Sequence, residues 1–514
     1  MTSKLTIVAG IDYYGGAMAD APAWSDGDRT LTFGAIRQRS DRAARSLLSL
    51  GIERGRHVAV MLDNQLGYPE VIAAIAKAGL VIVPLNTHST STEIAQLFER
   101  CEPAAVITES KYADRIVEAS NTYAPEHRYA VDAVPEFAAW ETLVENGPAS
   151  GALPELQEMD TFCVSFTGGT TGQPKGVMLN HRSRALTFHY MALDFNLGPG
   201  RRSINATPLY HGAGMAYGYG FMNAGVHIHT MRKWDPEHLL HLVKTHRPHQ
   251  LFLVPSQLQD LRELGVGRMR EAGFHTIETA FSTAAPLPHD LMMWFTTEFP
   301  EIVFADVYGG TEAGVVSVLK TPALRQKVGS AGPPWFMTEV KLLDKERNEV
   351  EPGQPGELFS RSPYLFNGYL NDPEQTKAVM TPDGFVTAGD VAVQDEDGFL
   401  FIVDRAKDMV ITGGVNVYPR EVEECLHKHP SVADVAVVGV PHPRWGEELV
   451  AIVVPASGAR IDSEELTAYC ARTLSKFKVP KRFLVRESLG RTVTGKLQKD
   501  QLRAWARTQL DTTG

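Results

Sequence analysis

Cysteine is scarce in this sequence. The 514 residues contain four cysteines, at positions 101, 163, 425 and 470. They lie far apart and no two of them form a CxxC pair. We therefore expect neither a disulfide framework nor a structural zinc site, and a reducing cytoplasm is the compartment that fits best.

Long apolar runs are also missing. The most apolar window, Val71 to Leu85, is interrupted by Lys77, Gly79 and Pro84 and is too short to cross a bilayer. It predicts a helix followed by a buried strand. The N-terminal residues lack a basic region followed by a sustained apolar stretch, so the sequence predicts neither a secretory signal nor stable membrane insertion.

A basic excess is absent as well. Lys and Arg number 50 against 61 Asp and Glu, which gives a formal net charge of -11. A nucleic-acid-binding protein more often carries a basic excess, so this balance argues against nucleic acid as a partner. It leaves room for a local basic pocket that binds an anionic ligand.

Helical and strand patterns alternate along most of the chain, which is typical of an α/β fold. The length exceeds that of one ordinary domain. Predicted helices cover residues 33–48, 68–78, 183–193, 236–246, 287–298, 419–427 and 463–474. Predicted strands cover residues 57–62, 80–85, 162–166, 250–254, 302–307, 398–403, 432–440 and 449–455. A polar, glycine-rich stretch begins at Arg405, so we expect a boundary there, with residues 1–404 and 405–514 on its two sides.

Residues 166–177 read FTGGTTGQPKGV and resemble a phosphate-binding loop. Glycines let backbone N–H groups approach phosphate closely, and threonine hydroxyls add donors. Lys175 supplies a positive charge. The loop is expected to follow a strand and to lead to a helix. It is not a Walker A loop, because Pro174 precedes the lysine and Gly176 follows it.

Other motifs follow in order and together resemble the adenylate-forming superfamily, which includes acyl-CoA synthetases such as 4-coumarate-CoA and fatty-acid-CoA ligases, peptide-synthetase adenylation domains and beetle luciferases. The matching segments span roughly residues 30 to 500. They are PLYHGAG (208–214), STAAPL (282–287), YGGTE (308–312), GEL (356–358), GYLNDPEQT (from 368), TAGD (387–390), DRAKD (404–408), GVNVYP (414–419) and TGK (494–496). The resemblance implies a large multi-subdomain N-terminal α/β domain and a small mobile α+β C-terminal domain.

The resemblance also implies a site for each reactant. Its implied activity is that of an acyl-CoA synthetase, with ATP, Mg²⁺ and coenzyme A as cofactors. Implied ATP or AMP contacts are Thr167, Gly168, Gly169, Thr170, Thr171, Gly172, Lys175, Ala284, Ala285, Tyr308, Gly309, Gly310, Thr311, Asp390, Ile402, Arg405 and Lys496. Implied metal contacts are Thr170 and Glu312. Implied catalytic residues are Lys496, Thr311 and His211, with Lys407 as the hinge and Gly413 and Gly414 lining the approach of the thiol.

Implied acid-pocket residues are His211, Met215, Tyr217, Ser282, Thr283, Gly309 and Gly314. The segment around them, HGAGMAYGYGFMNAG, mixes glycines with aromatic side chains, which favours an aromatic or medium-length acid. Thr283 stands where the family usually has glycine. Gly168, Gly310, Gly490 and the pair Thr387–Ala388 also depart from the family pattern. None of these departures removes a charged catalytic group, so they bear on the substrate more than on the chemistry.

Alternatives remain at this stage. A GxGxxxG spacing at Gly212–Gly218 is a poor dinucleotide fingerprint. Six histidines between positions 227 and 249 have no suitably spaced carboxylate or cysteine, so we expect solvated helix histidines and no metal site. Within the superfamily an amine could replace coenzyme A as acceptor, and a luciferase-type oxidation is more remote. The basic stretch KFKVPKR at 476–482 is either a contact for coenzyme A phosphates or a solvated face.

Overall fold

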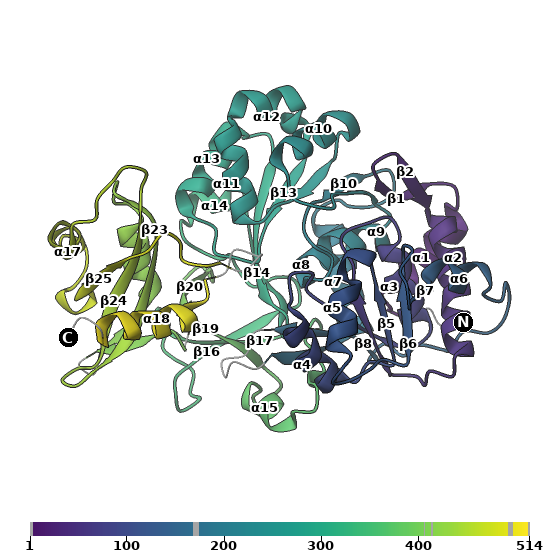
Figure 1. Cartoon of the computed structure of the whole chain (residues 1–514). Coiled ribbons are helices and arrows are strands. Elements are labelled where there is room, and N and C mark those ends of the chain that lie inside the picture. The colour runs from purple at the N-terminus through teal and green to yellow at the C-terminus, as the bar shows by residue number, and fades with distance from the viewer. Residues whose placement is uncertain (1–3, 168–173, 406, 413–414, 492–496, 512–514) are drawn as a thin grey trace. The chain divides into compact units, whose positions relative to one another are not determined.

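The computed structural model describes residues 4–167, 174–405, 407–412, 415–491 and 497–511 (Figure 1). The chain divides into two compact units. The first unit comprises residues 1–328, 335–339 and 361–386, and the second comprises 329–334, 340–360 and 387–514. The expected mixed α/β architecture is confirmed. The predicted boundary between residues 404 and 405 falls within a strand of the second unit, Leu400–Arg405, and the predicted hinge residue Lys407 follows that strand. Both stay predictions.

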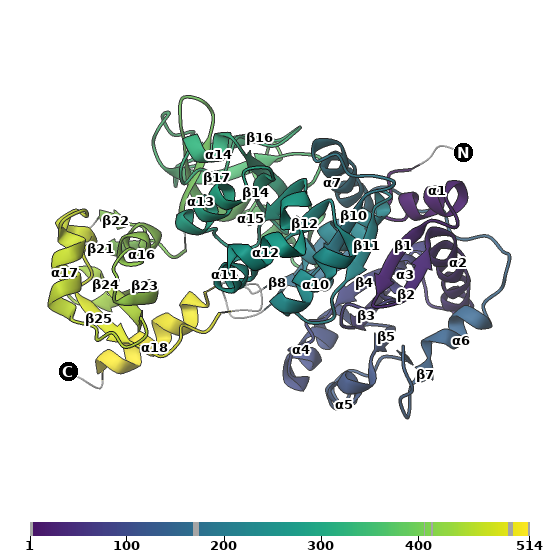
Figure 2. The same cartoon turned by 90° about the horizontal axis from the view of Figure 1, so that it is seen from above.

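One eight-stranded sheet of the first unit has the order β18-β9-β8-β4-β3-β5-β6-β7. Its strands are β3 (His57–Met61), β4 (Val81–Pro84), β5 (Ala105–Thr108), β6 (His127–Ala130), β7 (Ala138–Ala139), β8 (Thr161–Thr167), β9 (Lys175–Asn180) and β18 (Gly368–Tyr369). The associated helices are α1 (Ala9–Ala17), α2 (Phe33–Ser49), α3 (Tyr68–Lys77), α4 (Ser91–Cys101), α5 (Ser110–Ala119), α6 (Trp140–Glu145) and α7 (His181–Asp194). Helix α2 packs beside α1, α3 and α6 (Figure 2).

A second eight-stranded sheet of the first unit has the order β15-β14-β13-β12-β10-β11-β1-β2. Its strands are β1 (Pro22–Asp26), β2 (Arg29–Thr32), β10 (Arg202–Asn205), β11 (His227–Thr230), β12 (Gln250–Phe252), β13 (Thr279–Ser282), β14 (Val303–Gly310) and β15 (Gly314–Lys320). Its helical connections are α8 (Gly212–Gly214), the π-helical turn Met215–Gly220, α9 (Phe221–Asn223), α10 (Pro236–His246), α11 (Pro255–Leu264), α12 (Val266–Ala272), the 3₁₀ turn Phe274–Thr276, α13 (His289–Glu298) and α14 (Ala323–Gln326).

The second unit holds two smaller sheets, with orders β16-β17-β19-β20 and β22-β21-β24-β23, and β25 pairs with β24. Their strands are β16 (Glu339–Leu343), β17 (Gly356–Arg361), β19 (Val386–Gln394), β20 (Leu400–Arg405), β21 (Val410–Thr412), β22 (Val415–Val417), β23 (Val432–His442), β24 (Gly446–Pro455) and β25 (Arg482–Val485). The remaining helices are α15 (Pro373–Ala378), which belongs to the first unit, and α16 (Pro419–Leu426), α17 (Ser463–Ala471), the 3₁₀ turn Lys476–Lys478 and α18 (Lys499–Asp511).

The helix and strand patterns of the sequence are confirmed for all of the predicted elements, with shifts of a few residues at their ends. Helix α2 shows why the patterns are reliable. Thr32 caps it, because the Thr32 hydroxyl accepts a hydrogen bond from the Ala35 amide at 3.1 Å. Phe33, Ile36 and Leu47 recur at helical spacing and are fully buried.

The prediction that the phosphate loop leads to a helix is wrong. Residues 175–180 form strand β9, which pairs antiparallel with β8 from Thr161↔Asn180 to Thr167↔Lys175. β8 and β9 are thus antiparallel neighbours, and α7 begins only after β9. Lys175–Asn180 carries the buried Val177 and Leu179, and pairing with β8 satisfies the backbone groups of these residues in a sheet.

The prediction of solvated helix histidines is wrong for part of the histidine cluster. His227 and His229 lie on β11, and the ring of His229 stacks on that of His246 with 3.6 Å between centroids. Burial, followed by the charges of neighbouring histidines and Arg202, lowers the pKa of His229 to about 3. The rings of His229 and His246 therefore pack against one another, and His229 is buried.

This pKa shift predicts acid sensitivity. A histidine with a lowered folded-state pKa stabilises the fold fully above its unfolded pKa of about 6.5, and that stability is lost as the pH falls toward about 3. The Tm of the His229→Asn variant is therefore expected to fall less than that of wild type between pH 7 and 5. Calorimetry at the two pH values measures the change in Tm of each protein, and equal changes in Tm would contradict the prediction.

No helix in the described part of the chain is long and apolar enough to cross a membrane.

Candidate active site

The base of the phosphate loop is held by the β8–β9 hairpin. Thr167 and Lys175 are paired in register at its open end. The Lys175 ammonium lies 5.2 Å from the centroid of the Tyr369 ring. The predicted loop residues Gly168, Gly169, Thr170, Thr171 and Gly172 lie outside the described residues. The strand pairing therefore positions the two ends of the loop and directs Lys175 toward β18.

The YGGTE motif forms the turn between β14 and β15. Gly310 pairs with Gly314, and Gly309 pairs with Val315. A Cβ atom on Gly309 would lie 2.1 Å from the carbonyl oxygen of Gly314, so only glycine fits there without backbone movement. Tyr308 is partly exposed at the end of β14. The turn thus places Tyr308, Thr311 and Glu312 within one short segment.

The Glu312 carboxylate is fixed by a tyrosine from another strand. The Tyr369 hydroxyl donates a hydrogen bond to Glu312 Oε1 at 2.9 Å. Burial, together with the charge of Glu312, raises the pKa of Tyr369, so its hydroxyl remains a donor at neutral pH. Because Lys175 lies over the same ring, Tyr369 brings the base of the phosphate loop and the acidic residue of YGGTE together.

A partly buried arginine of α7 supports the same turn. Arg184 donates to the carbonyl of Thr311 at 2.7 Å and to that of Tyr364 at 3.2 Å. Burial lowers the pKa of Arg184 to about 10, which still leaves the guanidinium charged at neutral pH. Its donors satisfy carbonyl groups that the tight turn leaves outside the strand ladder.

The STAAPL segment begins at the carboxyl end of β13. The Thr283 hydroxyl donates to the carbonyl of Val307 on β14 at 2.5 Å, which fixes the position of this side chain. Ser282 is fully buried. Ala284 has a φ of 76°, a left-handed conformation that is unfavourable for a residue with a Cβ. Such strain is typical of backbone held in place for a functional contact. Ala285 follows directly, partly exposed.

The expected acid-pocket helix runs without interruption through α8, the π-helical turn and α9. His211 occupies the position before its first turn. Met215 and Tyr217 are buried, 7% and 4% exposed, in the π-helical turn. π-helical turns are frequent at functional sites. The Tyr217 ring stacks on that of Phe252 with 4.2 Å between centroids and lies 5.5 Å from that of Phe281.

Backbone conformation and packing also require a glycine at position 314. It has a φ of 70°, and a Cβ atom there would lie 2.6 Å from the Cβ of Tyr364. Its assignment to the acid pocket stays a prediction.

In the second unit, Asp390 and Arg405 are cross-strand partners on β19 and β20. Arg405 Nε lies 2.9 Å from Asp390 Oδ1. Asp390 is 8% exposed. The carbonyl of Ile402, on the same strand as Arg405, accepts a hydrogen bond from Arg420 at 3.1 Å. The arrangement pairs a carboxylate with a guanidinium across the two strands, and their predicted nucleotide contacts stay predictions.

The predicted hinge residue Lys407 pairs with Asp500 of α18, with 3.3 Å between Nζ and Oδ2. This contact ties the segment after β20 to the helix that follows the predicted catalytic lysine. Lys496 itself, Gly413 and Gly414 lie outside the described residues, so their roles stay predictions.

No group of three or more His, Cys, Asp or Glu side chains suited to a metal ion occurs among the described residues. Glu312 is the carboxylate that fits Mg²⁺ here, because Mg²⁺ is commonly held by one or two carboxylates together with substrate phosphates. Thr170, the other expected metal contact, lies outside the described residues.

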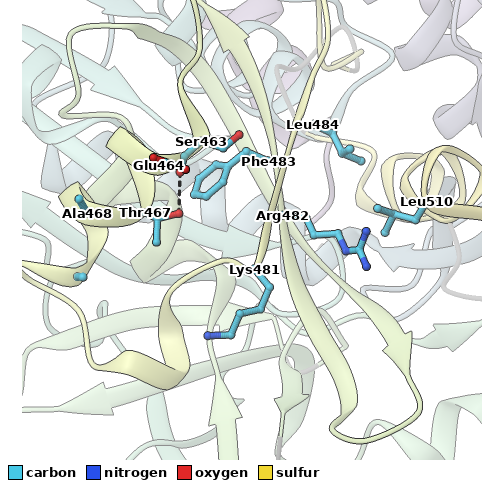
Figure 3. Close-up of a pocket in the computed structure, with 10 residues that line it drawn as sticks. Ser463, Glu464, Thr467, Ala468, Lys481, Arg482, Phe483, Leu484 and Leu510 are labelled. Atoms are coloured by element: carbon cyan, nitrogen blue, oxygen red, sulfur yellow. Dashed lines mark hydrogen bonds between the residues drawn. The ribbon is translucent and has the colours of Figure 1, made fainter. Parts of the chain in front are cut away.

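A pocket of about 560 Å³ lies elsewhere, in the second unit. It is lined by α17, β25 and the end of α18, with Phe483 and Thr467 on one side of the strand and Leu484 and Leu510 on the other (Figure 3). Lys481 and Arg482 of the basic stretch 476–482 line it, whereas none of the residues implied for the ATP, metal or acid sites does.

Two residues that position the site were not predicted to do so. Tyr369 belongs to the GYL motif, but the motif alone gives no partner for it. Arg184 belongs to a predicted helix, but the sequence pattern of that helix gives no partner for it. Their contacts to Glu312 and Thr311 span 57 and 127 positions of sequence, which no local pattern reveals.

The family described as AMP-binding enzyme matches residues 15–370, and the AMP-binding enzyme C-terminal domain matches residues 421–496. The chain is similar to a feruloyl-CoA synthase of an Amycolatopsis species, with 34% identity over 94% of this chain and 95% of that protein.

Solved structures show the same likeness. ATP-bound MatB from Rhodopseudomonas palustris matches with a TM-score of 0.87 and 28% identity, covering 97% of this chain and 99% of that one. The amide bond synthetase McbA from Marinactinospora thermotolerans matches with a TM-score of 0.86 and 26% identity, covering 96% and 99%.

Proposed function

We propose, since this chain belongs to the family of AMP-binding enzymes, that it activates a carboxylic acid with ATP and Mg²⁺ and transfers the acyl group to coenzyme A. The proposal rests on two contacts of Tyr369, one with Lys175 and one with Glu312. This residue joins Lys175 at the phosphate loop to Glu312 of YGGTE, and these are the groups that a magnesium–triphosphate requires.

The first half-reaction would join two anions. The acid carboxylate attacks the α-phosphate, and pyrophosphate leaves. Mg²⁺, held by Glu312 with Thr170, would neutralise phosphate charge. Lys175 and the backbone N–H groups of residues 168–172 would bind the phosphates, with Thr167 and Thr311 beside them. Lys496 would bridge the carboxylate and the α-phosphate, where charge develops in the transition state.

The resemblance supports the following contacts to the nucleoside. Tyr308 would stack on adenine, with Gly309, Gly310, Ala284 and Ala285 as backbone contacts. The Asp390–Arg405 pair, whose atoms lie 2.9 Å apart, would bind the ribose hydroxyls and the nucleotide, near Ile402.

The second half-reaction needs a thiol. We propose that Lys407 is a hinge, and that Gly413 and Gly414 line the path of coenzyme A. In the basic stretch 476–482, Lys478 pairs with Glu421 at 2.6 Å and Arg482 with Glu448 at 3.1 Å. Lys476 and Lys481 form no ion pair with a carboxylate among the described residues, which makes them the better candidates for coenzyme A phosphates.

We propose an aromatic or hydrophobic acid as the substrate. Tyr217, Phe252 and Phe281 form a cluster of rings next to Thr283 and Met215, and aromatic walls suit an aryl group. The similarity to a feruloyl-CoA synthase supports this class. His211, Gly309 and Gly314 would complete the pocket.

An amine acceptor is the second candidate, since an amide bond synthetase shares the fold. Adenylation would be the same for both.

A cytoplasmic location fits the four cysteines, all of which are free thiols.

Product identification tests the acceptor. The enzyme is incubated with Mg-ATP, an aryl acid, coenzyme A and a primary amine, and the products are identified by mass spectrometry. An acyl-CoA thioester formed with AMP is expected. An amide that forms equally well without coenzyme A would overturn the choice of acceptor.

A further inference from the structure

Several buried polar side chains on one sheet of the first unit have no hydrogen-bond partner among the described residues. Asn205 is 3% exposed and Gln250 is fully buried, and neither the oxygen nor the nitrogen of either amide is satisfied. The hydroxyl of Thr230, 5% exposed, is in the same situation. Leaving a buried polar group unpaired is unfavourable, so water or a ligand is expected to supply the partners.

These side chains share one face of the sheet. Asn205 is paired in register with Thr230, and Ser203, two residues earlier, is paired with Gln250. Side chains two apart on a strand point to the same face. Continued by one residue, the register between β10 and β12 places Asn205 beside Phe252. The ring of Tyr217, from the acid-pocket helix, stacks on that of Phe252.

Asn205 differs from Gln250 in its position along the strands. Asn205 is the last residue of β10, whereas Gln250 is the first residue of β12. Strand β11, which follows β10 in the chain, lies on one side of β10, and the next strand, β12, lies on the other side. The direction in which strands are added to the sheet therefore switches at β10. Ligands bind outside the carboxyl ends of strands at such a switch point. Asn205 therefore lies at the ligand-binding edge, and Gln250 at the opposite edge.

The acid-pocket helix packs directly against the Asn205 amide. A Cβ atom on Gly218 would lie 3.0 Å from Asn205 Cγ and 3.1 Å from its Oδ1. Gly218 follows Tyr217, which faces the ring cluster. The unpaired amide thus lies against the helix that the resemblance assigns to the acid pocket.

We infer that Asn205 determines specificity by hydrogen-bonding a polar substituent, such as a ring hydroxyl, at the far end of an aryl acid. This inference rests on the proposed function and narrows its substrate class to aryl acids with a hydrogen-bonding ring substituent. The amide offers both a donor and an acceptor, so a hydroxyl can bond with it in either direction. A site built for such a bond rejects an analogue that lacks it, because the amide is then left unpaired.

The experiment compares cinnamate with its 4-hydroxy and 3-hydroxy derivatives, using kcat/KM for acid-dependent pyrophosphate release. Wild type is expected to prefer at least one hydroxylated acid by about 10-fold or more. Asn205→Leu, nearly isosteric, is expected to lose that preference and to retain activity on cinnamate. Gln250→Met is the matched control. It removes an equally buried unpaired amide from the same face at the opposite edge, and the preference should remain that of wild type.

The outcomes separate the two claims. If Asn205→Leu keeps the wild-type preference, or if wild type has no preference, the inference is overturned. The proposed function still stands in either case, provided that pyrophosphate release depends on the acid. If both variants lose the preference equally, the effect is a general one of core packing and the inference is also overturned. Failure to release pyrophosphate with every acid overturns both. Should Asn205→Leu not fold, Asn205→Ser, which keeps one hydroxyl, is expected to reduce the preference by a smaller factor.

Discussion

Lys496→Ala is expected to abolish adenylate formation while leaving thioester formation from supplied acyl-adenylate nearly unchanged. In the first half-reaction the carboxylate and the α-phosphate approach as two anions, and the lysine would stabilise the charge that develops between them. Removal of one such group commonly lowers the rate by about 10²- to 10³-fold. Once the mixed anhydride exists, that repulsion is no longer part of the barrier.

Separate assays of the two half-reactions measure this difference. Pyrophosphate release follows the first, and appearance of the thioester from synthetic acyl-adenylate follows the second. Lys428→Ala, which removes an exposed lysine of the same unit, is the control for loss of charge alone. Loss of both half-reactions to the same extent would contradict the assignment of Lys496.

Glu312→Gln is expected to lower adenylation by about 10²-fold or more and to raise the Mg²⁺ concentration needed for half-maximal rate. Glutamine has nearly the same shape and still accepts the hydrogen bond from Tyr369, which is 2.9 Å long in the wild type. The substitution therefore removes the charge and leaves the contact in place.

Tyr369→Phe is the matched variant for this experiment, because it removes the hydrogen bond and keeps the carboxylate. It is expected to reduce the rate by a smaller factor, with less change in the Mg²⁺ requirement. Titration of the initial rate with Mg²⁺ at saturating ATP distinguishes the two. If Tyr369→Phe and Glu312→Gln shifted the Mg²⁺ curve equally, Glu312 would act through the hydrogen bond and not as a metal ligand.

The sequence predicted most of the fold because most elements carry a strong local pattern. Helix α10 has the predicted bounds, with Asp235 capping it through hydrogen bonds from the amides of Glu237 and His238. The errors concern pairing between segments. The phosphate loop is predicted to lead to a helix, although Lys175–Asn180 pairs with β8. The histidines on β11 are predicted to be solvated helix residues, although they lie on a strand.

The candidate site could be predicted as a set of motifs but not as an arrangement. YGGTE, STAAPL and the phosphate loop were identified in sequence order. The contacts that join them come from Arg184 and Tyr369, which are distant in sequence from their partners. The unpaired amide of Asn205 was also missed, because burial without a partner is a property of the packed sheet and has no local signature.

Acid-dependent pyrophosphate release from Mg-ATP, with and without coenzyme A, tests the central claim most directly. The account predicts release that depends on an aryl or hydrophobic acid, with faster turnover to AMP and a thioester when coenzyme A is added. Absence of release with every acid of a panel from aryl to short and long alkyl acids would contradict it.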